Sequence, residues 1–271
     1  MTAQLPKFDT PPVVETVLSV QFAPLQKFTD AHAGWFWKNY LDSEWSDVQV
    51  APKIDDQFEL FGDEMRWGPT GAFRIATGPG SERIQLIRSD NERMIQIQDT
   101  RFIYNWKKQE GSYPSYDELL PEFQRVFTQF KNFTVEAGFG PLIPNQWEVT
   151  YVNHIPKGKL WESVKDWPTI FSALQAPGTN AFELSSEDFR GEWRSIIGGN
   201  LGRLYTTLSR GRVGSDKGPE IILLQFTARG PTNPEETTDL QNGFRLGHES
   251  IVLSFTEMTS DTAHKHWKRR A

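Results

Sequence analysis

Hydrophobic and polar residues alternate in several short stretches of the chain, a pattern typical of β-strands. The first stretch, VVETVLSVQF, follows Pro11 and Pro12, and it places Glu15 on the more polar of its two faces. A second clear strand is QWEVTYVNHI, at residues 146–155. Further alternating runs are AFRIATG, RIQLIRS, RMIQIQD, RFIYNWK, EWRSIIGG, GRLYTTLSRGRV and PEIILLQFTARG. The turn-forming segments GPGSE and SDNE predict that neighbouring strands are antiparallel.

Apolar residues at helical spacing predict two long helices. The first follows Ser115, which has capping-box spacing to Glu118. The second lies near the C-terminus, with Asn233 as its N-cap and Pro234 in its first turn. Shorter helices are predicted in AHAGWFWKNYL and WESVKDWPTIFSAL.

The order of strand, helix, several strands and long helix occurs twice along the chain. It predicts an α+β fold in which long helices pack across an antiparallel sheet, as a tandem pseudo-repeat. The two halves are residues 1–140 and 141–271, joined by the Gly- and Pro-rich segment 138–145. Alternatively, they form one continuous domain. Residue identity between the halves is low, so the repeat is one of shape.

The proline pair, Glu15 and the strand around them resemble the start of a sporadically distributed bacterial family of unknown function, whose members have about this length. The resemblance extends to IQIQDTRFIYNW at residues 95–106 and to VTYVNHI at residues 149–155. Near the C-terminus it includes His248, Ile251, Phe255 and Trp267. It implies one full-length unit of bacterial or phage origin and carries over no activity. The element order of each half also resembles half of the TATA-binding protein or a helix-grip unit, which says nothing about function.

Composition narrows the class of protein. The 271 residues include ten Trp and nineteen Phe, which indicates a folded chain, and no Cys, which excludes disulfides and thiolate metal sites. The start MTAQLPKF lacks a signal-peptide pattern, and no apolar run approaches the roughly 20 residues of a membrane span. We therefore expect a soluble cytoplasmic protein with no membrane partner. The net charge of −6 disfavours nucleic acid, so duplex DNA should bind weakly.

Motifs for catalysis or metal binding are absent from the sequence. The five histidines lack H-E-x-x-H or similar spacing, and no G-x-S-x-G elbow occurs. The segments TGPGSER and GGNLGR lie between predicted strands, so we interpret them as hairpin turns and not as phosphate-binding loops. We interpret His264 and His266 as parts of a solvated basic tail. The sequence thus predicts no catalytic residue, metal or cofactor.

Aromatic residues are the most suggestive candidates for a binding site. Trp35, Trp37 and Trp45 cluster near the first helix, either as core residues or as a recognition surface, because Trp often anchors interfaces. Trp106 and His248 are further candidates. Glu15 is predicted to be structural, paired with an arginine or with backbone N–H groups, since an unpaired buried charge is costly. The alternative is a binding or catalytic acid.

Three functions remain open at this point. The first is a non-enzymatic binding or regulatory protein that acts through a protein partner or self-association, in a role such as defence or toxin control. The second is a small-molecule-binding protein with a cavity between the long helix and the sheet. The third, which is least supported, is an enzyme with dispersed catalytic residues. A pocket with convergent polar groups favours the last two functions, whereas a flat aromatic patch favours the first.

Overall fold

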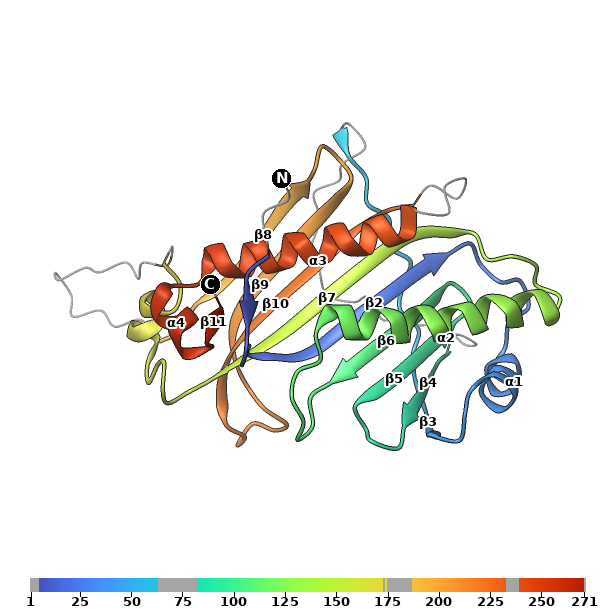
Figure 1. Ribbon diagram of the computed structural model, residues 1–271, viewed down its shortest axis with the longest axis horizontal. Coiled ribbons are helices and arrows are strands. Elements are labelled where there is room, and N and C mark those ends of the chain that lie inside the picture. Colours follow the sequence, from blue (N-terminus) through green and yellow to red (C-terminus); the bar gives the residue numbers. More distant parts are fainter. Residues whose placement is uncertain (1–4, 63–81, 173, 175–186, 233–238, 271) are drawn as a thin grey trace.

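A computed structural model of the protein describes residues 5–62, 82–172, 174, 187–232 and 239–270. The α+β class and a large antiparallel sheet, both predicted from the sequence, are confirmed (Figure 1). The sheet contains β2 (Val13–Phe22), β3 (Trp45–Pro52), β4 (Glu82–Arg88), β5 (Arg93–Gln98), β6 (Arg101–Lys107), β7 (Pro144–Pro156), β8 (Arg190–Ile197), β9 (Gly202–Arg212) and β10 (Glu220–Pro231). Its strand order is β3-β4-β5-β6-β2-β7-β10-β9-β8.

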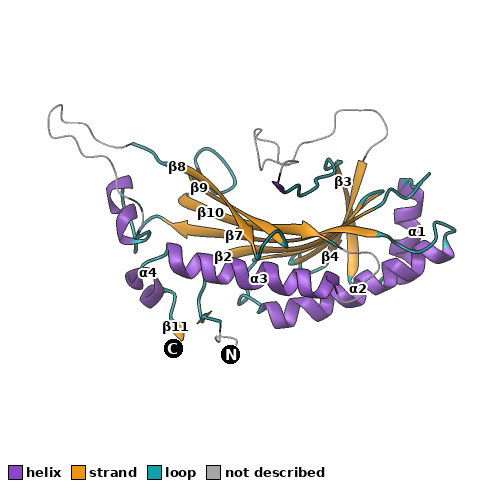
Figure 2. Cartoon of the chain, turned by 90° about the horizontal axis from the view of Figure 1, so that it is seen from above, coloured by secondary structure: helices purple, strands orange, loops and turns teal. Residues whose placement is uncertain are grey.

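The remaining elements are helices and a small terminal sheet. The helices are α1 (Asp30–Tyr40), α2 (Tyr116–Glu136), the 3₁₀ helix η2 (Val164–Thr169), α3 (Asp239–Met258) and α4 (Asp261–His266). Strands β1 (Lys7–Phe8) and β11 (Arg269–Arg270) pair with each other, so the two ends of the chain meet. Figure 2 shows α2 and α3 on the same face of the large sheet.

Local sequence explains α2 well. The Ser115 side chain accepts from the third residue of the helix, and Glu118 accepts from the Ser115 backbone N–H at 2.7 Å, so the predicted capping box is confirmed. The helix buries the apolar face that its sequence pattern predicts: Leu119, Phe123, Val126, Phe127 and Phe130. Phe102 of β6 meets this face, with its ring centroid 5.0 Å from that of Phe130.

The predicted halves contribute to a single sheet, because β2 of the first half pairs with β7 of the second. Outward from this central pair comes the last strand that each half contributes to this sheet, β6 on one side and β10 on the other. Strands β5, β4 and β3 then follow on one side, and β9 and β8 on the other.

Several predicted elements differ from the structure or lie outside it. Strand β3 was not predicted, and the helix expected in residues 161–174 is only the six-residue η2. The GGNLGR hairpin turn is confirmed, with φ of 50°, 64° and 79° at Gly198, Gly199 and Asn200. The run AFRIATG, most of TGPGSER and the Asn233 cap lie outside the described residues.

The prediction of a solvated basic tail was wrong for His264. Its side chain is buried, and its Nε2 lies 2.8 Å from the Thr259 hydroxyl. Ser260 caps α4 by accepting from the Ala263 N–H, and this turn directs the tail back against the body of the protein. Trp267 is buried there, with its ring centroid 5.1 Å from that of Phe255.

Candidate functional site

A cavity of about 870 Å³ lies between α3, the start of α2 and the N-terminal segment. Strands β7 and β10 also contribute to its lining, so it sits where a helix meets the sheet. The apolar part of its wall includes Val13, Leu120, Phe226, Ile251, Val252 and Phe255. The size falls within the range of about 300–1,000 Å³ that is usual for small-molecule sites.

His248 of α3 is the best-oriented polar group in this wall. Its Nδ1 lies 2.8 Å from the Tyr151 hydroxyl, and its ring stacks on that of Tyr116 with centroids 4.0 Å apart. These two contacts fix both the position and the plane of the imidazole. Burial lowers the pKa of His248 to about 4, so the ring is neutral at pH 7.

Tyrosines surround this imidazole. Burial raises the pKa of Tyr113, Tyr116 and Tyr151, so all three hydroxyls stay protonated at neutral pH. The Tyr116 hydroxyl is buried, and the part of the chain that the structure describes offers it no hydrogen-bond partner. A buried hydroxyl without a partner costs about 1–3 kcal/mol, so it is a feature that calls for a functional explanation.

Charged side chains lie at the rim of the cavity, mostly in pairs. Arg245 donates to Glu249 across one helical turn at 3.2 Å, and Arg270 forms an ion pair with Asp9. These pairs place the charges at the edge and leave the interior to aromatic and aliphatic groups.

The two chain ends form one wall of the cavity. The backbone N–H of Asp9 donates to the Lys268 carbonyl, and that of Thr10 donates to the Trp267 carbonyl, each at 3.2 Å. The Phe8 ring packs against Phe255 with centroids 5.4 Å apart. The site therefore depends on residues from both ends of the sequence.

The structure brings two of the predicted site residues near each other. His248 lines the cavity, and Trp106 is fully buried beside it, with its ring centroid 5.4 Å from that of the lining residue Tyr113. Tyr113, Tyr116 and Tyr151 were not predicted as site residues. The available signal was the spacing of these residues around the Ser115 cap, since Tyr113 precedes it and Tyr116 is the first residue of α2.

The three tryptophans near α1 lie apart from this cavity. Trp37 donates from Nε1 to the Trp45 carbonyl at 2.6 Å, and Trp45 is buried. Trp35 is 38% exposed, yet its ring also packs on Phe133 of α2. Packing against neighbouring residues therefore explains the positions of most of these tryptophans.

Glu15 lies on the opposite face of the sheet from α2 and α3. Its carboxylate accepts from Asn105 at 2.7 Å, where we expected an arginine or backbone N–H groups. Asn105 accepts in turn from Gln96 at 2.7 Å, and Gln96 from Gln85 at 2.9 Å. This ladder of amides crosses four neighbouring strands and ends at the carboxylate. The structural role of Glu15 stays a prediction, now with a defined partner.

Replacing Glu15 with glutamine should lower the free energy of unfolding by about 1 kcal/mol, because a charge-assisted hydrogen bond becomes a neutral one. Urea unfolding checks this expectation, with Glu257→Gln on the exposed face of α3 as the control. Unchanged stability combined with lost ligand binding would instead assign Glu15 to a site.

A segment that we call the strap, residues 53–61, crosses the face of the sheet that carries Glu15. Figure 2 shows it on the side opposite to the helices. Side chains of the sheet hold its backbone: Gln21 accepts from the Gln57 N–H at 2.9 Å, and Arg203 donates to the Leu60 carbonyl at 2.9 Å. The strap thus covers one end of a polar sheet face.

Four buried charged residues of the sheet lie beneath the strap, namely Arg101, Glu148, Arg203 and Arg229, and the strap itself adds a fifth, Glu59. Glu59 accepts from Arg203 and, at 3.2 Å, from Arg229, which also donates to Glu148 at 2.6 Å. Arg101 lies 3.7 Å from Glu148. Burial alone would raise the pKa of Glu148, but the two arginines beside it hold that pKa below its ordinary value. Because both carboxylates are bound by arginines of the same cluster, we assign the cluster to structure.

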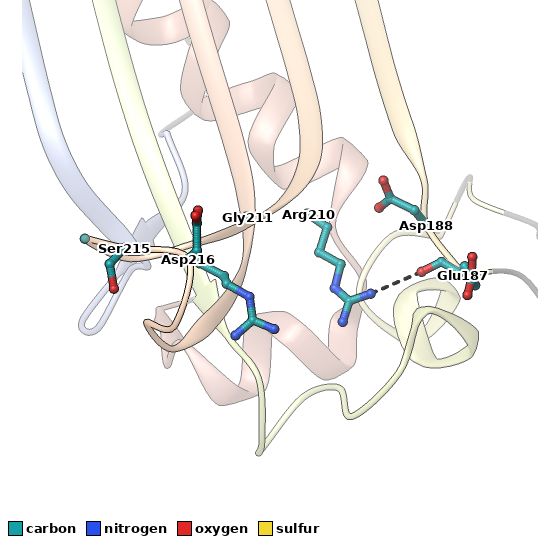
Figure 3. Close-up of a pocket in the computed structure, with 8 residues that line it drawn as sticks. Glu187, Asp188, Arg210, Gly211, Ser215 and Asp216 are labelled. Carbon is teal, nitrogen blue, oxygen red and sulfur yellow. Dashed lines mark hydrogen bonds between the residues drawn. The ribbon is translucent and has the colours of Figure 1, made fainter.

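A second hollow, of about 750 Å³, lies beside the β9–β10 hairpin (Figure 3). Arg210 donates there to the Glu187 carbonyl at 3.2 Å, and both Arg210 and Arg212 donate to Glu220. Both arginines of this hollow are thus already hydrogen-bonded to other groups of the protein. The hollow is polar and open, which makes it a weaker candidate than the cavity at α3.

Among the described residues, no group of three or more His, Asp or Glu side chains is arranged to hold a metal ion. No helix in the described part of the chain is both long and apolar enough to cross a membrane. Comparison with known proteins gives no matching family model, curated protein or solved structure.

Proposed function

We propose that the protein is a non-enzymatic small-molecule-binding protein and that its site is the cavity at α3. The observation that carries this proposal is the convergence of His248, Tyr116 and Tyr151 on one part of a cavity that also has a substantial apolar lining. Small-molecule sites combine an apolar lining with a few well-placed polar groups, which is the arrangement found here.

The state of His248 favours binding over acid–base catalysis. A general base works best when its pKa lies near the working pH. The pKa of His248, about 4, lies well below neutrality because of burial. A neutral imidazole held by two tyrosines is suited to hydrogen bonding with a ligand.

The tandem pseudo-repeat with long helices packed across the sheet remains part of the proposal. The strand order on either side of the β2–β7 pair supports it, since α2 and α3 each follow the strand that lies next to this pair. In this view, both halves form the cavity: the second contributes α3, β7 and β10, and the first contributes the N-terminal segment and the start of α2. A bacterial origin and a cytoplasmic location are carried over from the sequence.

A protein partner, or self-association, is the second candidate. Strand β8 is an edge of the sheet, and its residues Trp193 and Ile196 are 39% and 57% exposed. An edge strand with exposed apolar side chains offers a place for another chain to pair. An accessory role in defence or toxin control would rest on such a partner. Weak binding of duplex DNA remains the expectation from the net charge.

The small-molecule proposal can be tested with the uncharged fluorescent probe N-phenyl-1-naphthylamine. We expect one probe per chain and an increase in its fluorescence on binding. Val252→Trp, which places a large ring in the cavity wall, should weaken binding by about tenfold or more. Leu253→Trp is the matched control, because Leu253 is the next residue of α3 and is 45% exposed.

Equal binding to both variants and the wild type would locate the probe outside the cavity and contradict the proposal. Thermal unfolding of each variant, measured alongside, identifies a loss of binding caused by misfolding. A covalent change in the probe is not expected, and mass spectrometry after long incubation checks this.

A further inference from the structure

The charges around the cavity at α3 restrict what it can bind. Three basic side chains, Lys7, Arg245 and Arg270, line it against four acidic ones, Asp9, Asp117, Glu118 and Glu249. Two of the three cations already form ion pairs with carboxylates of the same rim. The third cation, Lys7, is exposed to solvent. An anionic ligand in the interior would therefore have to displace the paired carboxylates or lose its hydration with little compensation, and either is costly.

The interior offers polar groups that carry no charge. His248 is neutral there, and the hydroxyls of Tyr113, Tyr116 and Tyr151 are protonated. Such groups donate and accept hydrogen bonds but do not compensate a full charge. They fit a ligand whose polar atoms belong to groups such as amide, hydroxyl, ketone or aromatic amine.

Aromatic rings shape the rest of the cavity. Phe8 and Phe226 both meet Phe255 edge to face, with centroids 5.4 Å and 6.4 Å away. Edge-to-face and offset stacking favour a further flat ring over a branched aliphatic group of the same size. The stacked pair of His248 and Tyr116 adds a polarised ring edge at one side.

We infer that the cavity takes an uncharged aromatic molecule and that a hydrogen-bonding group of this molecule lies at His248. This inference rests on the proposed small-molecule function and adds the class of ligand. His248 acts in it as a specificity-determining residue, held in place by Tyr151 and Tyr116.

Two probes that share one ring system test the charge of the ligand. The compound 8-anilinonaphthalene-1-sulfonate has the rings of N-phenyl-1-naphthylamine with an added sulfonate. We expect the uncharged probe to bind more tightly by about tenfold or more. Val252→Lys, which adds a cation without a partner to the cavity wall, should reduce this preference about tenfold, whereas Leu253→Lys should leave it unchanged.

The hydrogen bond is tested with 1-benzylnaphthalene, in which a methylene group replaces the N–H of the first probe. The wild type should bind the amine several-fold more tightly than 1-benzylnaphthalene, a difference that corresponds to about one net hydrogen bond. His248→Phe keeps a ring that can stack on Tyr116 and should abolish this preference. A preference that persists in His248→Phe would overturn the role of His248.

The outcomes separate the inference from the function on which it rests. Equal or tighter binding of the sulfonate, still lost in Val252→Trp, would overturn the uncharged class and leave the small-molecule site in place. Binding of both probes that is indifferent to Val252→Trp would remove the site itself. A preference for the uncharged probe that Val252→Lys does not change would also overturn the inference, since it would reflect only the lower polarity of that probe.

Discussion

Replacing Glu148 with glutamine is expected to lower the free energy of unfolding by about 3–5 kcal/mol, because it breaks a buried ion pair from one side. The carboxylate is 3% exposed and lies 2.6 Å from Nε of Arg229 and 3.7 Å from Arg101. Glutamine keeps the shape but leaves the two guanidinium groups with less compensating charge. Urea unfolding at pH 7 measures the effect.

The control is Glu249→Gln, which also breaks an ion pair but at a half-buried position at the surface of α3. Its expected cost is only about 0.3–0.5 kcal/mol, as is usual for surface pairs one helical turn apart. Similar losses in the two variants would show that the cluster beneath the strap is solvated, contrary to the structure.

The pH dependence follows from the lowered pKa of Glu148. A carboxyl whose folded-state pKa lies below its ordinary value of 4.5 contributes stability above that pH. This contribution is lost as the pH falls through the lowered folded-state pKa. The difference in stability between the wild type and Glu148→Gln should therefore shrink as the solution is acidified below about pH 4.5.

The cluster beneath the strap explains why the polar face of the sheet is not simply a solvated surface. Ser19 and Gln21 of β2 lie on the face that the alternating pattern assigned to polar residues, and both are only 1% exposed. The strap supplies the cover, and Glu59 supplies a second carboxylate for the arginines. This arrangement stabilises the sheet far from the cavity, so the two sites can be altered separately.

Local signals in the sequence were sufficient for the elements that depend on neighbouring residues. The capping box of Ser115 and Glu118 and the glycines at 198 and 199 act within a few residues, and the structure confirms both. Strands β2 and β7 were also predictable, because they alternate over ten residues or more. The pairing of β2 with β7 joins residues that are far apart in the sequence, so no local pattern predicts it.

Elements that depend on distant segments could not be predicted in this way. Strand β3 has seven exposed or half-exposed residues in succession, since it pairs with β4 alone at the edge of the sheet. The short strands β1 and β11 exist only because the chain ends meet. Contacts between distant segments also bury His264 and Glu59, so the sequence around either residue did not predict its burial.

The candidate site was predictable only in part. His248 stood out beside the apolar stripe of the last helix, and it does line the cavity. Its partners Tyr116 and Tyr151 are 132 and 97 positions away, on other elements, so nothing near His248 in the sequence indicated them. The surroundings of Trp147 could not be predicted from its sequence neighbours either, because the four glycines around it come from β9, β10 and α3.

Gly202, Gly230, Gly243 and Gly247 together form the space that Trp147 fills. A Cβ atom added at any of them would lie within 3.0 Å of the Trp147 ring, closer than real Cβ contacts. The indole itself is 1% exposed, so it cannot move outward into solvent. This contact fixes how closely α3 approaches β7, and α3 carries His248 and Val252 into the cavity wall.

Gly243→Ala is therefore expected to destabilise the protein by about 1–3 kcal/mol through overpacking, although alanine favours helices by about 1 kcal/mol over glycine. The new Cβ would lie 2.5 Å from Cγ of Trp147. Gly34→Ala in α1 is the matched control, since nothing lies within 4 Å of its Cβ position and alanine there should stabilise. Trp147→Phe should make Gly243→Ala less costly, because contacting residues are not additive. Equal stabilisation by the two alanines, measured by urea unfolding, would refute this close packing of α3 on Trp147.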